Sequence, residues 1–120
     1  REQHGLEEAI NRGHQFKAAG ADIIFIESPE SEAEFNAIGA AFPGVSLLAN
    51  MVEGGRSPLL SRDKLRDMGF NFIIYPVAAM ATTAASLQNT YAELAKGNVT
   101  SERVSFQQLS QLVGFDIAEK

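Results

Sequence analysis

Continuous apolar runs alternate with amphipathic segments along the chain. Apolar residues recur at helical spacing over residues 5–19, which predicts a helix with one apolar face. The segment at 22–26 is almost entirely apolar and rich in β-branched residues. This pattern is typical of strands that are buried on both faces of a parallel sheet. A strand followed by a helix is predicted three times from this point, and one more helix ends the chain.

Turn and capping signals give the limits of the other predicted elements. Ser31 with Glu34 has the sequence signature of a capping box at the start of the second helix. Ser105 and Gln108 open the last helix, and Gly114 ends it. The remaining strands are predicted at 45–49 and 70–75, and the remaining helices at 31–42, 61–68, 77–96 and 105–113.

This order of elements indicates an α/β fold with a parallel sheet. Two architectures fit the order: a small three-layer α/β domain, or a piece of a (β/α)8 barrel. A complete barrel needs roughly 250 residues. The chain has 120 residues and starts with Arg rather than Met, so we expect it to begin inside a longer protein. A polar break at Gly97 and Asn98 predicts a division between an α/β segment at 1–98 and a helical segment at 99–120.

Charge and composition exclude several classes of function. The chain has 10 Lys and Arg against 15 Asp and Glu, a formal charge of -5, and no basic stripe. We therefore expect neither a nucleic-acid partner nor binding to anionic lipid. No apolar run approaches the roughly 20 residues of a membrane helix. The chain contains no cysteine, which excludes a thiolate zinc site and a cysteine nucleophile within it. The absence of cysteine is compatible with a reducing compartment, and we expect a cytoplasmic protein.

Polar side chains stand where two of the three predicted strands stop. Glu27 follows the first strand, Asn50 follows the second, and the third ends at Tyr75 and Pro76. Ligands of parallel sheets bind beyond the carboxyl ends of the strands. A carboxylate there can move a proton or hold a metal-bound water, and a carboxamide can donate to an oxyanion. The alternative is that both side chains only satisfy backbone groups of the loops.

A glycine-rich loop at 53–58 follows the second strand. Its paired glycines leave room for a ligand to approach the backbone, although the loop has neither a Walker A nor a dinucleotide-binding signature. An ordinary flexible loop is the competing interpretation, and Arg56 within it is either an anion-binding residue or solvated. Ser28 has no histidine nearby in the sequence, which argues against a nucleophile.

Three motifs of the chain resemble the isocitrate lyase/phosphoenolpyruvate mutase superfamily. They lie at residues 18–29, 48–59 and 68–76, in the order and at the spacing of that superfamily. Residues 5–9 and the ending at 112–116 are similar to it as well. The resemblance implies an α/β fold that forms the last three strands of a (β/α)8 TIM barrel, followed by a C-terminal helical extension.

The resemblance also implies a set of site residues. Members of the superfamily make or break C–C or P–C bonds next to a carboxylate, and they use Mg2+ to hold the oxyanion or enolate of the substrate. Carried over by motif, Glu27 is expected to be catalytic, and the Mg2+ ligands are expected upstream of this segment. Substrate contacts are expected from Asn50, Met51, Val52, Pro76 and Val77, with Glu53, Gly54 and Gly55 in a loop near the site.

The function implied by the resemblance is a Mg2+-dependent lyase that cleaves a C–C bond in a small 2-oxo or 2-hydroxy (di)carboxylic acid through an enolate. The sequence at 53–55 is similar to a branch with dimethylmalate lyase, oxaloacetate hydrolase and carboxyphosphonoenolpyruvate mutase. Val52 and Ala81 stand where methylisocitrate lyases tend to have Thr and Arg, which argues against a bulky tricarboxylate.

Two alternative functions remain open, and the resemblance also bears on activity and assembly. Mutase or phosphonate hydrolase chemistry on P–C bonds at the same site is one alternative. A non-catalytic α/β domain that binds a partner through exposed sheet edges is another. The 120-residue piece alone is expected to be inactive, because the metal ligands and catalytic loop of the superfamily precede it. The intact protein is expected to be a homo-oligomer, a tetramer joined through its C-terminal helices.

Overall fold

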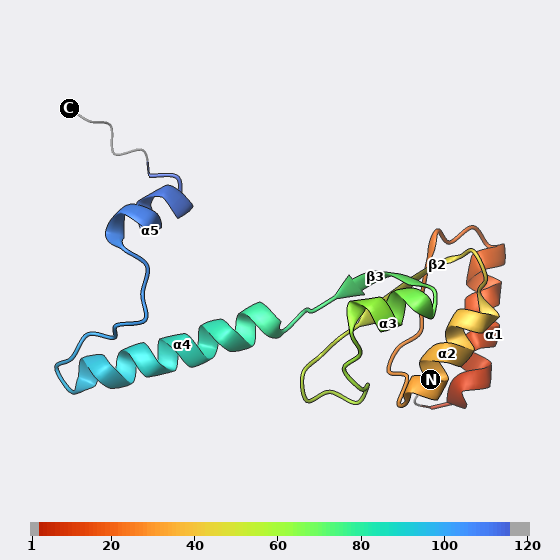
Figure 1. Cartoon of the computed structure of the whole chain (residues 1–120). Helices are drawn as coiled ribbons and strands as arrows, with labels where there is room; N and C mark the ends of the chain where they lie inside the picture. The colour runs from red at the N-terminus through yellow and green to blue at the C-terminus, as the bar shows by residue number, and fades with distance from the viewer. Residues whose placement is uncertain (1–2, 116–120) are drawn as a thin grey trace. The chain divides into compact units, whose positions relative to one another are not determined.

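The computed structural model describes residues 3–115, which contain five helices and three strands (Figure 1). Each predicted element is present, and no limit differs from the prediction by more than one residue. The elements are α1 (Gly5–Ala18), β1 (Ile23–Phe25), α2 (Glu32–Ala41), β2 (Ser46–Asn50), α3 (Arg62–Asp67), β3 (Phe70–Ile74), α4 (Ala78–Ala95) and α5 (Phe106–Leu112). The chain divides into two units, Arg1–Ala81 and Thr82–Lys120, which we describe separately.

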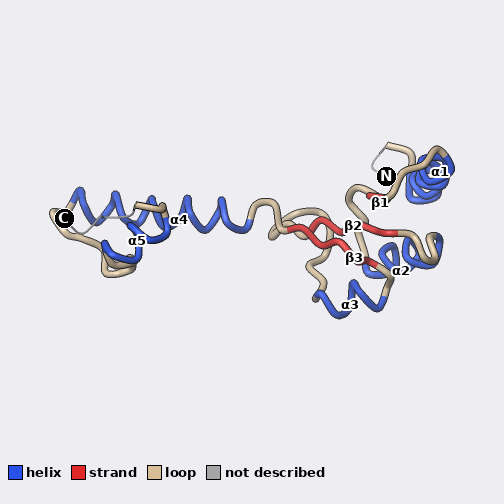
Figure 2. Tube along the Cα trace, turned by 90° about the horizontal axis from the view of Figure 1, so that it is seen from above, coloured by secondary structure: helices blue, strands red, loops and turns tan. Residues whose placement is uncertain are grey.

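The first unit is built on a parallel sheet whose strands follow one another in the order β1-β2-β3 (Figure 2). The prediction of an α/β fold with a parallel sheet is therefore confirmed. One face of the sheet packs against the helices and forms the core. The strand residues Ile24, Leu47, Ala49 and Phe70 are buried there with the helix residues Phe35, Ile38 and Leu65.

The opposite face of the sheet is apolar but open. Ile23, Phe25, Phe72 and Ile74 retain between 40% and 46% of their exposure. The prediction of strands buried on both faces is therefore wrong within residues 3–115. The physical reason is that the core gathers on one face of the sheet, with α1, α2 and α3 supplying its helical side chains. The (β/α)8 barrel stays a prediction. In such a barrel this open face would be the one that points toward the interior.

A bulge between β2 and β3 decides which side chains reach the open face. Leu47 pairs with Phe70, but Leu48 pairs with Phe72, so Asn71 is an extra residue between the two pairs. The Leu47 N–H donates to Asn71 Oδ1 at 2.9 Å, which satisfies the backbone group that the bulge leaves out of the ladder. Phe70 is consequently buried in the core, whereas Phe72, two residues later, lies on the open face.

Side-chain caps explain where the helices begin. The Glu34 N–H donates to Ser31 Oγ at 3.2 Å, which confirms Ser31 as the N-cap of α2. The Glu34 carboxylate also accepts from the N–H of Glu30, at 2.8 Å. A complete capping box joins Ser105 and Gln108 at the start of α5.

The second unit contains most of α4 and all of α5. Apolar side chains of both helices are exposed, among them Leu87, Tyr91, Leu94, Phe106, Leu109 and Leu112. None of the described helices is long and apolar enough to span a membrane. The predicted division between an α/β segment at 1–98 and a helical segment at 99–120 stays a prediction. Asp116, the last residue of the family-like ending at 112–116, lies outside the described residues.

Candidate active site

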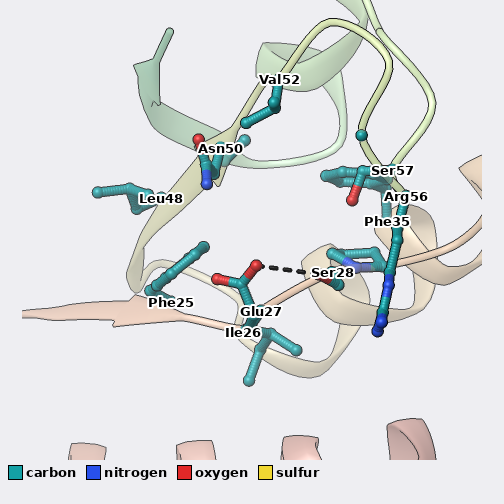
Figure 3. A pocket seen from close by; sticks show the side chains of 13 residues that line it. Phe25, Ile26, Glu27, Ser28, Phe35, Leu48, Asn50, Val52, Arg56 and Ser57 are labelled. Carbon is teal, nitrogen blue, oxygen red and sulfur yellow. Dashed lines mark hydrogen bonds between the residues drawn. The ribbon is translucent and has the colours of Figure 1, made fainter. Parts of the chain in front are cut away.

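A pocket of about 230 Å³ lies at the carboxyl ends of β1 and β2 (Figure 3). Glu27 reaches it from just beyond β1, and Asn50 is the last residue of β2. The structure thus brings together the two strand-end residues that the sequence singles out. The other lining residues are Phe25, Ile26, Ser28, Pro29, Phe35, Leu48, Ala49, Val52, Gly55, Arg56 and Ser57.

The Glu27 carboxylate points into this pocket and is held by a neighbouring hydroxyl. Ser28 Oγ donates to Glu27 Oε1 at 2.9 Å. The backbone of Ser28 has a φ of 54°, which is in the left-handed region. Figure 3 shows Glu27 and Asn50 facing one another across the pocket, with the amide nitrogen of Asn50 on the side toward Glu27.

The side-chain oxygen of Asn50 does not make the hydrogen bond that an asparagine anchoring a loop would make. The Oδ1 of Asn50 is buried and has no hydrogen-bond partner among the described residues. Leaving a buried acceptor unsatisfied costs about 1–3 kcal/mol. An asparagine that anchors a loop would accept from a backbone N–H instead. Within residues 3–115 the structure therefore gives no support to the interpretation of Asn50 as a loop anchor, and its role in the site stays a prediction.

The glycine-rich loop closes one side of the pocket with a tight turn. The Gly55 N–H donates to Val52 O at 3.0 Å, and Gly54 adopts a φ of 72° at the third position of the turn. Type II turns require positive φ at that position, where glycine is favoured. A Cβ on Gly55 would lie 3.2 Å from the Cβ of Val52, so the turn holds Val52 tightly against the loop.

Several residues of the predicted site lie elsewhere. Met51 is 1% exposed and belongs to the core on the helix-covered face, so its side chain does not line the pocket. Its N–H donates to Ile74 O at 2.9 Å, which extends the pairing of β2 with β3. Pro76 and Val77 are not among the lining residues of this pocket either. Glu53 and Gly54 do not line it themselves, but they belong to the loop whose Gly55 does. The substrate contacts of Met51, Pro76 and Val77 stay predictions, as do the roles of Glu27, Asn50 and Val52.

Some lining residues were not predicted from the sequence. Phe25 and Leu48 precede Glu27 and Asn50 by two positions, so the alternation of side chains in a strand places them on the same face. That signal was available in the sequence. Phe35 is 1% exposed and serves both the core and the pocket wall. Ser57 is brought to the pocket by the loop, and no periodicity in the sequence predicts its position.

The pocket residues do not form a metal site by themselves. No group of three or more His, Asp or Glu side chains suited to a metal ion occurs among the described residues. The pocket lining contributes one carboxylate, that of Glu27. Mg2+ prefers an octahedron of oxygen ligands, usually with one or two carboxylates. The described residues therefore supply no complete set of Mg2+ ligands, and ligands outside the segment stay a prediction.

The sequence and fold identify the family. A family model described as phosphoenolpyruvate phosphomutase matches residues 1–95 of the chain. The chain belongs to the isocitrate lyase/phosphoenolpyruvate mutase superfamily. The resemblance carried by the three sequence motifs is thereby confirmed.

Relatives within the superfamily align over most of this chain. It is 41% identical over 116 residues to 2,3-dimethylmalate lyase of Eubacterium barkeri, covering 93% of this chain and 40% of the lyase. It is 34% identical to the chloroplastic carboxyvinyl-carboxyphosphonate phosphorylmutase of Arabidopsis thaliana, covering 93% of this chain and 34% of that protein. The solved structure of oxaloacetate acetylhydrolase in complex with the product oxalate matches with a TM-score of 0.88 and 31% identity, covering 94% of this chain and 40% of that one. The chain thus spans between 34% and 40% of the length of these relatives.

Proposed function

We propose that the chain is the C-terminal part of a lyase that cleaves a C–C bond in a small 2-oxo or 2-hydroxy (di)carboxylic acid through an enolate. The observation that carries the proposal is the Asn50 side chain, which faces the Glu27 carboxylate in the pocket and has a buried oxygen without a partner among residues 3–115. The names of two relatives contain a dimethylmalate and an oxaloacetate, which are acids of this class. Mg2+ belongs to the proposal as a cofactor whose ligands lie outside this segment.

The two side chains suit different parts of such a reaction. Cleavage of a 2-hydroxy acid removes the hydroxyl proton and breaks the bond to a neighbouring carbon that bears a carboxylate. The O–H electron pair forms a new C=O bond, the C–C electron pair moves onto that carboxylate as an enolate, and the enolate then takes up a proton. A 2-oxo acid first adds water, which supplies the hydroxyl group. Negative charge therefore develops on a substrate oxygen. The amide N–H groups of Asn50 can donate to this oxygen or to a substrate carboxylate. Glu27 can accept the hydroxyl proton or hold the hydroxyl by a hydrogen bond.

We also propose that the sheet is the last part of a (β/α)8 barrel, with residues 1–98 in the barrel and 99–120 in a helical extension. The open face of the sheet supports this proposal. Phe25, Leu48 and Phe72 are register partners across the three strands. In a barrel, apolar side chains of this face point inward, where alternate strands contribute them to successive layers. Active sites lie at the carboxyl ends of barrel strands, where Asn50 ends β2 and Glu27 lies just beyond β1.

A phosphoryl mutase or phosphonate hydrolase acting on P–C bonds is the second candidate. The observation that favours it is the match to the Arabidopsis phosphorylmutase. Both candidates use the same pocket, because each reaction generates negative charge on an oxygen beside a carboxylate.

The experiment assays the intact protein with Mg2+ and identifies the products by mass spectrometry. The panel contains 2,3-dimethylmalate, oxaloacetate and a carboxyphosphonate, with 2-methylisocitrate as the bulky acid on which Val52 and Ala81 predict weak turnover. C–C cleavage of a small dicarboxylic acid supports the proposal. Turnover confined to the phosphonate supports the second candidate, and a folded protein without turnover on any of these acids contradicts both.

A further inference from the structure

Ser28 stands in an unfavourable backbone conformation beside Glu27. Among residues 3–115 it is the one non-glycine residue with a positive φ, 54°. L-residues with a Cβ disfavour this region, and a following proline further pushes a residue toward extended conformations. Pro29 follows and is buried. Strained residues of this kind persist where the surrounding structure holds them, and they cluster at functional sites.

The hydroxyl of Ser28 makes an unusual hydrogen bond. Serine in a turn ordinarily bonds to nearby backbone groups. Ser28 Oγ instead donates to Glu27 Oε1 at 2.9 Å, and both residues line the pocket. Glu27 is exposed, and without this bond its side chain would sample several rotamers. The bond holds one carboxylate oxygen and leaves Oε2 for another partner in the pocket (Figure 3).

We propose that Ser28 is a positioning residue, whose left-handed backbone and hydroxyl hold the Glu27 carboxylate in its reactive orientation toward Asn50. The inference rests on the proposed function, because it assigns Ser28 no contact with the reacting atoms. Holding a reacting group in one orientation lowers the entropic cost of reaching the transition state, and small displacements of such a group are costly. Loss of the bond is therefore expected to lower kcat more than it raises KM.

Two variants of the intact protein separate the hydroxyl from the backbone strain. Ser28→Gly removes the hydroxyl but accepts positive φ without penalty, so its melting temperature is expected to equal or exceed that of the wild type. Its kcat is expected to fall by about 10- to 100-fold, since displacement of a catalytic group by about 1 Å costs up to that much. Ser28→Thr keeps the hydroxyl and is expected to retain most of kcat per folded molecule. Ser101→Gly removes an exposed serine hydroxyl outside the pocket and serves as the control.

The Glu27→Gln variant and the double variant Ser28→Gly/Glu27→Gln test whether Ser28 acts through Glu27. We expect the double variant to be no slower than Glu27→Gln alone, a result that a purely structural Ser28 would not give. Wild-type kcat in Ser28→Gly, measured beside an impaired Glu27→Gln, overturns the positioning role and leaves the proposed function in place. Wild-type kcat/KM in Glu27→Gln overturns the role of Glu27 and the inference with it.

Discussion

Replacing Asn50 with leucine separates activity from stability at the end of β2. Leucine has the same number and branching of side-chain heavy atoms as asparagine but no polar atoms. The Oδ1 that it removes is buried and lacks a partner among the described residues. Atoms of the segment itself already enclose this oxygen. We therefore expect the free-energy cost of leaving it without a hydrogen bond to be the same in the intact protein.

The magnitude follows from the cost of the unsatisfied oxygen. A buried acceptor without a partner costs about 1–3 kcal/mol, and exchange of polar for apolar groups of the same shape is close to neutral or stabilising. Leu48 and Val52 flank the position and offer apolar surface. We therefore expect Asn50→Leu to raise the free energy of unfolding by roughly 1 kcal/mol, the lower end of that range. Turnover should fall by about 100- to 1000-fold, as when a donor to an oxyanion is removed.

The assay combines urea denaturation with steady-state kinetics on the best substrate of the panel. Asn36→Leu is the matched control, because Asn36 is an exposed asparagine of α2, outside the pocket, whose amide donates to Glu32 O at 3.2 Å. It should leave turnover unchanged. If Asn50→Leu unfolds more easily than the wild type while its turnover per folded molecule is preserved, Asn50 is a structural anchor and the reasoning is refuted.

Three further predictions concern stability, titration and assembly. Gly39→Ala places a Cβ against the backbone carbonyl of Met68. Overpacking costs about 1–3 kcal/mol, which should exceed the roughly 0.5–1 kcal/mol that alanine gains over glycine in a helix. Urea denaturation should therefore show a lower free energy of unfolding. The pKa of Glu8 lies below its usual 4.5, chiefly because Arg12 donates to it, so Arg12→Gln should raise that pKa in an NMR titration. The pair stabilises the protein above about pH 4.5, and this contribution should disappear as the pH falls through the lowered pKa. Removing residues 99–120 from the intact protein should lower the number of subunits per particle measured by light scattering, and an unchanged number of subunits would contradict assembly through the C-terminal helices.

The elements and the place of the site could be predicted from local signals. Ser31, Ser61 and Ser105 each accept a hydrogen bond from the third residue of the helix that follows, so helix starts are encoded by single residues. The positions of Glu27 and Asn50 needed only the end of an apolar run and the rule that parallel strands share one carboxyl edge.

Features that depend on pairing between strands could not be predicted in this way. Phe70 and Phe72 are two positions apart and would share a face in a regular strand, but the bulge at Asn71 places them on opposite faces. The conformation of Ser28 opposes its local preferences, since a residue before proline is expected to be extended. The bulge arises from pairing between strands, and no local signal of the sequence predicts the conformation of Ser28.

The central claim is that Glu27 and Asn50 act together on one bound acid, and kcat/KM tests it most directly. We would measure Glu27→Gln and Asn50→Asp in the intact protein, on its best substrate. Glu7→Gln and Asn36→Asp, the same exchanges at exposed positions of α1 and α2, serve as controls. The prediction is a loss of about 100-fold or more for both pocket variants, with folded structure retained and both controls close to wild type. Wild-type kcat/KM in both pocket variants would contradict the claim and leave these strand ends as loop structure.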